Sequence, residues 1–247
     1  MSYSSRERAA EQGFTLLELL IVVSIIAILS VALILVLNPA ETLRKSRDAQ
    51  RISDLATMKT ALGLYLTSTS TPILGSSVTG IVTTGNTGML NTTCKTTPST
   101  AWGTSGAYKI WYSTVTTITD LALDGSSVVT PVQEALTANV NLVNGLGWIP
   151  VNFDTLTGGS PISNLPTDPT NTVADTASVR STDLVYRYAC SVTPLTFEID
   201  AQLESTAYTV TDDKRASDGG NSTLYYETGT NLSIFTAASP SAVGTDI

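Results

Sequence analysis

Histidine is absent from the 247-residue chain, which removes the side chain that enzymes most often use to move protons near neutral pH. This absence excludes Ser–His–Asp triads, Cys–His pairs and HExxH zinc sites. The two cysteines are too few for a Cys₄ zinc site. A membrane-tethered enzyme would need a carboxylate pair or a Ser/Lys arrangement, and no recognisable motif supports either. We therefore expect a protein that is not an enzyme.

A single carboxylate, Glu18, lies inside the long apolar run Phe14–Leu37. As a helix, this run would be about 36 Å long at about 1.5 Å per residue, enough to cross a hydrocarbon core of about 30 Å. A cleaved secretory signal is the alternative, but its apolar region is shorter and no convincing small-residue cleavage site follows the run. We interpret the run 14–37 as a transmembrane helix. A carboxylate within it costs about 2.5–3.5 kcal/mol at the bilayer centre and less near an end, so Glu18 is expected to have a partner.

The junction before this run is the most specific motif in the chain. Residues 8–20 read RAAEQGFTLLELL, a short charged leader that ends in Gly and is followed by Phe-Thr-Leu-x-Glu. This pattern resembles the class III signal of type IV pilins and pseudopilins. The resemblance implies that a prepilin peptidase removes the leader 1–13 by cutting between Gly13 and Phe14 on the cytoplasmic side. It also implies N-methylation of the new Phe14 amine.

Such a cut would create a partner for Glu18, the α-amino group of Phe14, which is positively charged near neutral pH. Within one helix the two groups would lie one turn apart. Between subunits, a neighbour shifted along the axis would bring its own amine to this carboxylate and fix the axial stagger of a helical bundle. We expect Glu18 to act in assembly in this way. The alternative is a side chain that only reaches toward the head-group region.

Cys94 and Cys190 are two cysteines in a region expected to lie in an oxidising compartment. A disulfide between them would close a loop of about 100 residues and stabilise the fold by at most about 4–5 kcal/mol in the chain-entropy model. Two separate buried thiols are the alternative, because the sequence does not show that the cysteines are near each other. We expect the disulfide.

An acidic, glycine-containing loop provides candidate metal ligands. Asp212, Asp213, Asp218 and Asn221 carry the hard oxygen atoms that Ca²⁺ prefers, and G-type pseudopilins have a calcium loop in a comparable place. The spacing does not match an EF-hand, and two basic residues lie in the middle of the loop. We expect a solvated turn with no cofactor, with calcium as the alternative.

A second helix is expected over residues 38–66. Asn38 as N-cap and Pro39 at the first position are typical of a helix start, although Pro39 could also kink one continuous helix. The pair Arg44 and Asp48 has i,i+4 spacing and is expected on the solvated side. The apolar stripe expected to pack against the head consists of Ile52, Leu55, Met58, Leu62 and Tyr65.

Residues 67–247 are predicted to form a β-rich head. The expected elements are a strand over 107–118, a helix from Thr130 to Gly145, an antiparallel pair over 184–190 and 195–203, and a hairpin over 224–226 and 232–235. An Asp-Pro turn, then Tyr-x-Tyr, then Phe-Glu-Ile-Asp-Ala is similar to the head of G-type pseudopilins. The resemblance implies an α+β, type IV pilin-like fold, with one long N-terminal helix packed on an antiparallel sheet.

Charge and composition bear on partners and location. The formal net charge of −8 argues against nucleic acid as a partner. Counting Lys and Arg around the apolar run favours an outside N-terminus. The Thr- and Ser-rich composition of the C-terminal part and its two cysteines favour an extracytoplasmic head instead. We expect a single-pass protein of the inner membrane with the head outside, which becomes part of an extracellular filament.

The function expected from these features is structural. The chain is predicted to be a subunit of a type IV pilus-like or type II secretion pseudopilus filament, a homo-oligomer that depends on prepilin peptidase, the membrane and an assembly platform. A low-abundance minor pilin with an adhesive, ligand-binding head is the alternative within the same class.

Overall fold

The computed structural model describes residues 14–75, 93–100, 108, 110–114, 139–173 and 183–235. The chain consists of two compact units, residues 1–43 and 44–247. Two helices are followed by a four-stranded antiparallel sheet, so the fold is α+β and consistent with the type IV pilin-like fold expected from the sequence. Most of the second helix belongs to the same compact unit as the head, and the leader 1–13 lies outside the described residues.

The two helices, α1 (Leu16–Leu37) and α2 (Pro39–Ser68), are separated by one residue. Asn38 has φ 37° and ψ 72°, in the left-handed region that Asn tolerates better than most residues. Its carbonyl oxygen accepts hydrogen bonds from the N–H groups of Glu41 and Thr42, at 3.1 and 3.2 Å. Pro39 takes the first position of α2, where its missing N–H costs nothing. Of the two arrangements considered for Pro39, the chain adopts a stop and a restart.

The apolar stripe of α2 packs on the head as expected. Leu55, Met58, Leu62 and Tyr65 are buried in the main core, and Ile52 is half-buried. Two charged residues, Asp48 and Arg51, continue the stripe toward the start of the helix and are also fully buried. The expectation that Asp48 lies on the solvated side is therefore wrong. Asp48 is buried because its carboxylate pairs with the buried guanidinium of Arg51.

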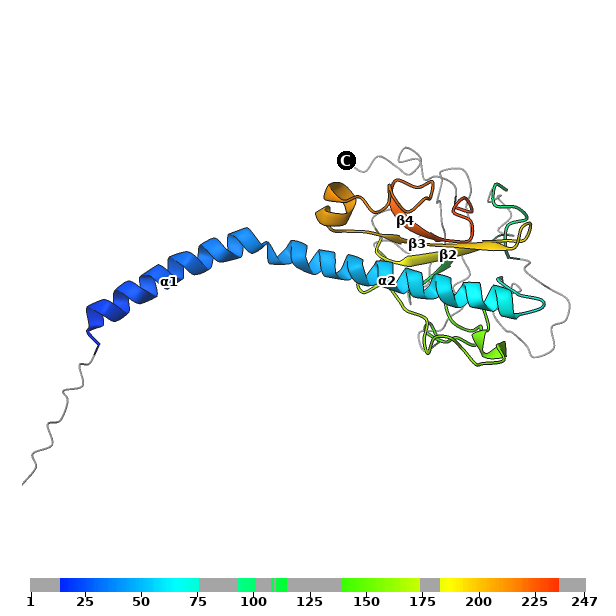
Figure 1. Cartoon of the computed structure of the whole chain (residues 1–247), viewed down its shortest axis with the longest axis horizontal. Helices are drawn as coiled ribbons and strands as arrows, with labels where there is room; N and C mark the ends of the chain where they lie inside the picture. The colour runs from blue at the N-terminus through cyan, green and yellow to red at the C-terminus, as the bar shows by residue number, and fades with distance from the viewer. Residues whose placement is uncertain are drawn as a thin grey trace, which may run out of the picture. The chain divides into compact units, whose positions relative to one another are not determined.

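The sheet consists of β1 (Trp111–Tyr112), β2 (Tyr186–Ser191), β3 (Thr196–Gln202) and β4 (Tyr225–Gly229), in that spatial order and antiparallel throughout. The β2–β3 pair confirms the antiparallel pair predicted from the sequence, with Tyr188 opposite Ile199. A short 3₁₀ helix, η1 (Phe153–Thr155), and a π turn, η2 (Ala207–Thr211), complete the elements of the described residues (Figure 1).

Both faces of the sheet are covered. Phe197, Ile199 and Ala201 point into the main core with the stripe of α2. The acidic residues Glu198 and Asp200 alternate with these apolar residues along β3, and they are fully buried on the opposite face. The second apolar cluster on that side consists of Ile110, Tyr112, Val185, Ala189, Ile234 and Phe235.

The strand predicted over 107–118 is wrong in length, because only Trp111 and Tyr112 form it among the described residues. Ser113 explains the early end. Its hydroxyl oxygen accepts from the N–H of Tyr186 at 2.9 Å and its hydroxyl donates to the side chain of Asn171 at 3.2 Å. The Ser113 N–H still donates to the carbonyl of Tyr186 at 3.0 Å, but the hydroxyl takes the place of the Ser113 carbonyl as acceptor for the return bond of a longer strand.

The helix predicted from Thr130 to Gly145 lies partly outside the described residues, and its described end, 139–145, is not helical. The carbonyl oxygens of Val140 and Val143 accept hydrogen bonds from the N–H groups of Trp148 and Phe153, at 3.0 and 2.8 Å. The second half of the predicted hairpin, 232–235, is also not a strand. Its N–H groups bind a buried carboxylate instead of a neighbouring strand.

Candidate processing and assembly site

The N-terminus of α1 is closed by a capping box. Thr15 is the N-cap, and its hydroxyl oxygen accepts from the N–H of Glu18 at 3.2 Å. The Glu18 carboxylate accepts in return from the N–H and the hydroxyl of Thr15, at 2.9 and 2.8 Å. The Thr-x-x-Glu spacing is the known signature of this motif and was readable in the sequence, where we weighed Glu18 only as an assembly or head-group residue.

The capping box holds the Glu18 carboxylate at the start of the helix, next to the residue that cleavage would expose. Phe14 precedes the N-cap and is 88% exposed, and Gly13 lies outside the described residues. The carboxylate thus lies at the positive end of the helix dipole and accepts from the N–H of Thr15. A positive amine on Phe14 would therefore be one residue away from the Thr15 N–H that the carboxylate accepts from.

The surface of α1 is apolar on every side. All side chains from Phe14 to Ile34 are exposed, and the segment Leu16–Ile34 has a mean hydropathy of 2.9 and is long enough to cross a membrane. Ser24 and Ser30 donate their hydroxyls to the carbonyl oxygens of Ile21 and Ile26, at 2.8 and 2.7 Å, so neither leaves an unmatched donor.

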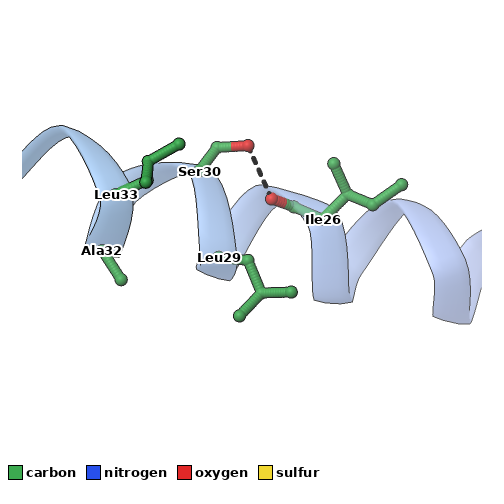
Figure 2. Close-up of a pocket in the computed structure, with 5 residues that line it drawn as sticks. All are labelled: Ile26, Leu29, Ser30, Ala32 and Leu33. Atoms are coloured by element: carbon green, nitrogen blue, oxygen red, sulfur yellow. Dashed lines mark hydrogen bonds between the residues drawn. The ribbon is translucent and has the colours of Figure 1, made fainter.

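A shallow hollow on α1 is formed by one helix alone. Figure 2 shows Ser30 bonded to the carbonyl of Ile26 beside Leu29, Ala32 and Leu33, with no side chain from another element. The hollow is part of the apolar surface that needs a cover, and it has no polar group free to orient a ligand.

The buried guanidinium of Arg51 joins α2 to two distant loops of the head. It donates to Asp168 twice, at 2.7 and 2.9 Å, and to Asp48 at 2.7 Å. Its other two donors reach Glu204 at 2.8 Å and Thr170 at 3.2 Å. All five N–H donors of Arg51 are therefore used, in a side chain that is 0% exposed.

The same cluster includes a more exposed ion pair. Arg47 donates to both carboxylate oxygens of Glu204, at 2.6 and 2.7 Å. The hydrogen bond from Arg47 lowers the pKa of Glu204 to about 2, against the opposing effect of burial and with help from Arg51. Burial opposes the charged form of Arg51, but its hydrogen bond to Asp168 and the neighbouring carboxylates outweigh burial and raise the pKa of Arg51.

Asp48 completes the attachment of α2 by binding backbone as well as Arg51. Its carboxylate accepts from the N–H of Glu204 at 3.1 Å and from the N–H of Ser205 at 2.7 Å. Asp48, Arg51, Asp168 and Glu204 were not predicted as a set from the sequence. The available signal was the position of Asp48 and Arg51 on the apolar stripe, seven and four positions before Leu55 in helical spacing.

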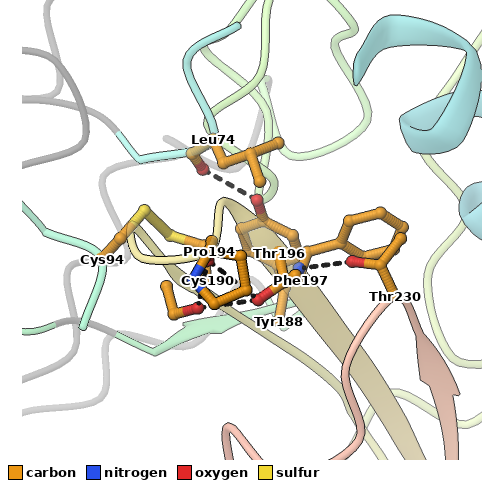
Figure 3. Close-up of a disulfide and its surroundings, with 9 residues drawn as sticks. Leu74, Cys94, Tyr188, Cys190, Pro194, Thr196, Phe197 and Thr230 are labelled. Carbon is orange, nitrogen blue, oxygen red and sulfur yellow. Dashed lines mark hydrogen bonds between the residues drawn. A yellow bond between two sulfur atoms is a disulfide. The ribbon is translucent and has the colours of Figure 1, made fainter. Parts of the chain in front are cut away.

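A disulfide joins Cys94 to Cys190, which are 96 positions apart in the sequence. Figure 3 shows it at the end of β2, beside the turn that contains Pro194 and leads into β3. The segment around Cys94 runs along this strand, since the N–H of Lys95 donates to the carbonyl of Cys190 at 2.8 Å. The two cysteines are thus a structural crosslink, and a third contact, from the Tyr188 hydroxyl to the carbonyl of Leu74, lies close by.

The acidic loop uses its polar groups internally. Asp212 pairs with Lys214 at 2.6 Å, and Asp213 pairs with Arg215 at 2.9 Å. Asp218 accepts from backbone N–H groups, and the side chain of Asn221 donates to the carbonyl of Phe235 at 3.3 Å. Within the described ranges, no group of three or more acidic or cysteine side chains is placed to hold a metal ion.

Residues 8–34 match the family model of the prokaryotic N-terminal methylation motif. The chain therefore carries the prepilin-type signal of type IV pilins and pseudopilins, as its sequence suggested, and such a signal implies processing by prepilin peptidase. No curated protein and no solved structure matched the chain. The described geometry and this motif together indicate a membrane-anchored precursor of the pilin type.

Proposed function

We propose that the protein is a structural subunit of a type IV pilus-like or type II secretion pseudopilus filament. The observation that carries this proposal is α1, an apolar helix whose side chains are exposed from Phe14 to Ile34 directly after a prepilin-type signal. An apolar surface of this length is not stable in water and needs lipid or other copies of the helix around it.

In the proposed cycle, the membrane first covers α1, and neighbouring copies replace the lipid during assembly. Cleavage after Gly13 supplies the Phe14 amine. The capping box holds the Glu18 carboxylate where an amine of the same or a neighbouring copy can pair with it, in surroundings that strengthen the attraction. The disulfide supports a head outside the cytoplasm, since such bonds persist in oxidising compartments.

The cleavage step is tested on the protein made in cells with and without an active prepilin peptidase. Mass spectrometry should find an N-terminal, methylated Phe14 only where the peptidase is present. Gly13→Leu should retain the leader, because the bulky side chain occupies the position next to the bond. Ser4→Leu introduces the same residue far from the cleaved bond and should be processed normally.

A mature Phe14 end in Gly13→Leu, or an intact Met1 end in cells with an active enzyme, would show that the cleavage assignment is wrong. Filament membership is tested separately, by looking for the mature protein in sheared surface fibres or in purified secretion complexes.

A further inference from the structure

The face of the sheet opposite α2 contains an unbalanced set of buried charges. Three buried carboxyl groups, of Glu198, Asp200 and Glu227, and the half-buried carboxyl group of Asp218 lie near the guanidinium of Arg187, and the buried ammonium of Lys95 donates to the carbonyl of Ile234. Arg187 binds both oxygens of Asp200, so this pair is balanced. Glu198 and Glu227 are 0% and 1% exposed and have no cation bonded to them among the described residues.

Each of these two glutamates uses one oxygen to hold a segment against the sheet. Glu198 Oε2 accepts from the N–H groups of Ile234 and Phe235, at 2.7 and 2.9 Å. Glu227 Oε2 accepts from the N–H of Ser222 at 2.8 Å. The segments before and after β4 are therefore fixed by side chains of the strands that they cover.

The second oxygens, Oε1 of Glu198 and Oε1 of Glu227, are buried and receive no donor from the described residues. The strand register places the side chains of Glu198 and Glu227 on the same face of the sheet. Gly229 lies opposite Glu198 and has no side chain, so Glu227, the diagonal neighbour on the same face, can reach Glu198. The two buried carboxyl groups are therefore neighbours on one face of the sheet. A hydrogen bond between two carboxyl groups requires a proton on one of them, whereas two ionised groups would repel.

We propose that Glu198 keeps a proton in the folded head and donates it toward the neighbouring Glu227 carboxylate, and that this pair is a pH-sensitive latch. While the proton is present, the latch holds the residues before β4 and the residues Ile234 and Phe235 against the sheet. When the proton leaves, two adjacent buried negative charges loosen both segments.

The surroundings favour the protonated pair. Burial, the hydrogen bond with Glu227 and the charges of Glu227 and Asp200 raise the pKa of Glu198 well above its ordinary value, although the N–H of Phe235 opposes this. Burial also raises the pKa of Asp200 to about 6 despite Arg187. The titratable and charged groups that face this region from the elements around it are Tyr112, Asp183, Arg187, Asp200, Asp218, Tyr225 and Lys95, whose ammonium donates to the carbonyl of Ile234.

The sign of the pH effect follows from a raised carboxyl pKa. The stability of the latch is fully present below the ordinary glutamate pKa of 4.5 and is lost as the pH rises through the raised value. Within this window, each pH unit should lower the protection of the held amides about tenfold.

The test uses the full chain in detergent micelles and measures amide hydrogen exchange from about pH 5 to about pH 8, corrected for the intrinsic pH dependence of exchange. In the wild type, peptides containing Ser222, Ile234 and Phe235 should lose protection as the pH rises, by up to about tenfold per pH unit below the raised pKa of Glu198. Glu198→Gln keeps an acceptor for Ile234 and places a neutral donor beside Glu227, so it should remain folded and lose this slope. Asp154→Asn, a change of the same kind at an exposed position, should keep it.

A second measurement reads the proton directly in the unaltered protein. At neutral pH its infrared spectrum should show the carbonyl stretch of a protonated carboxyl group, absent from Glu198→Gln and from Glu227→Gln. A missing band in the wild type, or an unchanged exchange slope in Glu198→Gln, would overturn the proposal. Finally, the exchange measurement is repeated with added calcium chloride. Protection that rises with calcium in the wild type but not in Glu198→Gln would overturn the proposal, because it would place a cation, and not a proton, between the carboxylates.

Discussion

At the scale of single residues, the head treats its buried charges in two different ways. Arg51 is surrounded by acceptors that match all five of its donors, so its charge is kept in the folded state. Glu198 has donors for one oxygen only, and its other oxygen is buried without a donor from the described residues. A buried charge with all its hydrogen bonds made, such as Arg51, stays charged and holds two elements together. A buried carboxyl group with an unbonded oxygen, such as Glu198, makes a site that responds to pH.

Replacing Arg51 should therefore be far more harmful than replacing its neighbour on the helix. Arg51→Met leaves Asp168 and Asp48 buried without their cation and should lower the free energy of unfolding by about 3–5 kcal/mol. Arg47→Met is the matched control, because Arg47 is 35% exposed and an exposed pair contributes about 0–1 kcal/mol. Urea unfolding of both variants measures the difference, and equal small losses would show that the cluster does not attach α2 to the head.

The sequence could not identify this cluster, although its residues were visible. Asp168 and Glu204 lie 117 and 153 positions from Arg51, and no periodic pattern links residues so far apart. Charged residues at the start of an amphipathic helix usually face solvent. The disulfide was easier to predict, because two cysteines can form only one disulfide and the alternative is two separate thiols.

At the scale of elements, α1 begins with a motif that gives Glu18 two possible uses. The capping box needs a side chain that accepts from Thr15, and Gln serves this purpose as well as Glu. Pairing with an amine needs a negative charge. The two uses can therefore be separated by substitution.

Glu18→Gln should insert and be cleaved normally but should assemble poorly, as should Glu18→Ala, because both lose the charge. Thr15→Ala loses the hydroxyl of the cap, at a typical cost of about 1 kcal/mol, and keeps the carboxylate, so most of the filament yield should remain. The yield of protein in sheared fibres, normalised to processed protein in the membrane, is the measurement. Normal yield from Glu18→Gln would mean that capping is the whole role of Glu18.

The sequence predicted the elements with strong apolar periodicity. It did not predict the elements whose ends are set by a side chain that takes the place of a backbone hydrogen-bond partner. The helix of residues 39–68 and the pair β2–β3 follow from spacings of three to four and of two. β1 ends early because the Ser113 hydroxyl replaces a backbone partner, and residues 232–235 bind Glu198 in place of a strand. The early end of β1 and the conformation of residues 232–235 both depend on tertiary contacts, and a local sequence pattern carries no information about these contacts.

At the scale of the whole molecule, the chain combines two units with opposite requirements. The unit that contains α1 has an apolar surface that needs a cover, whereas the head is a closed core with buried polar clusters on both sides of its sheet. The head contains the disulfide, which links the segment around Cys94 to β2 across a long stretch of chain. Since the bond restricts the unfolded chain more than any single contact, the stability of the head should depend on the redox state of its surroundings.

The final prediction concerns this crosslink. The double variant Cys94→Ser with Cys190→Ser should lower the free energy of unfolding by about 2–5 kcal/mol, because a loop with a sequence separation of 96 is no longer closed in the unfolded state. Urea unfolding of the full chain in detergent, followed by the fluorescence of the buried Trp111 and Trp148, measures the change. The wild type with a reducing agent should behave like the double variant. The slope against urea should also be steeper without the bond, since an unfolded chain without the crosslink exposes more surface. Equal free energies of unfolding for the oxidised wild type and the double variant would show that the packing around β2, and not the disulfide, holds this part of the head.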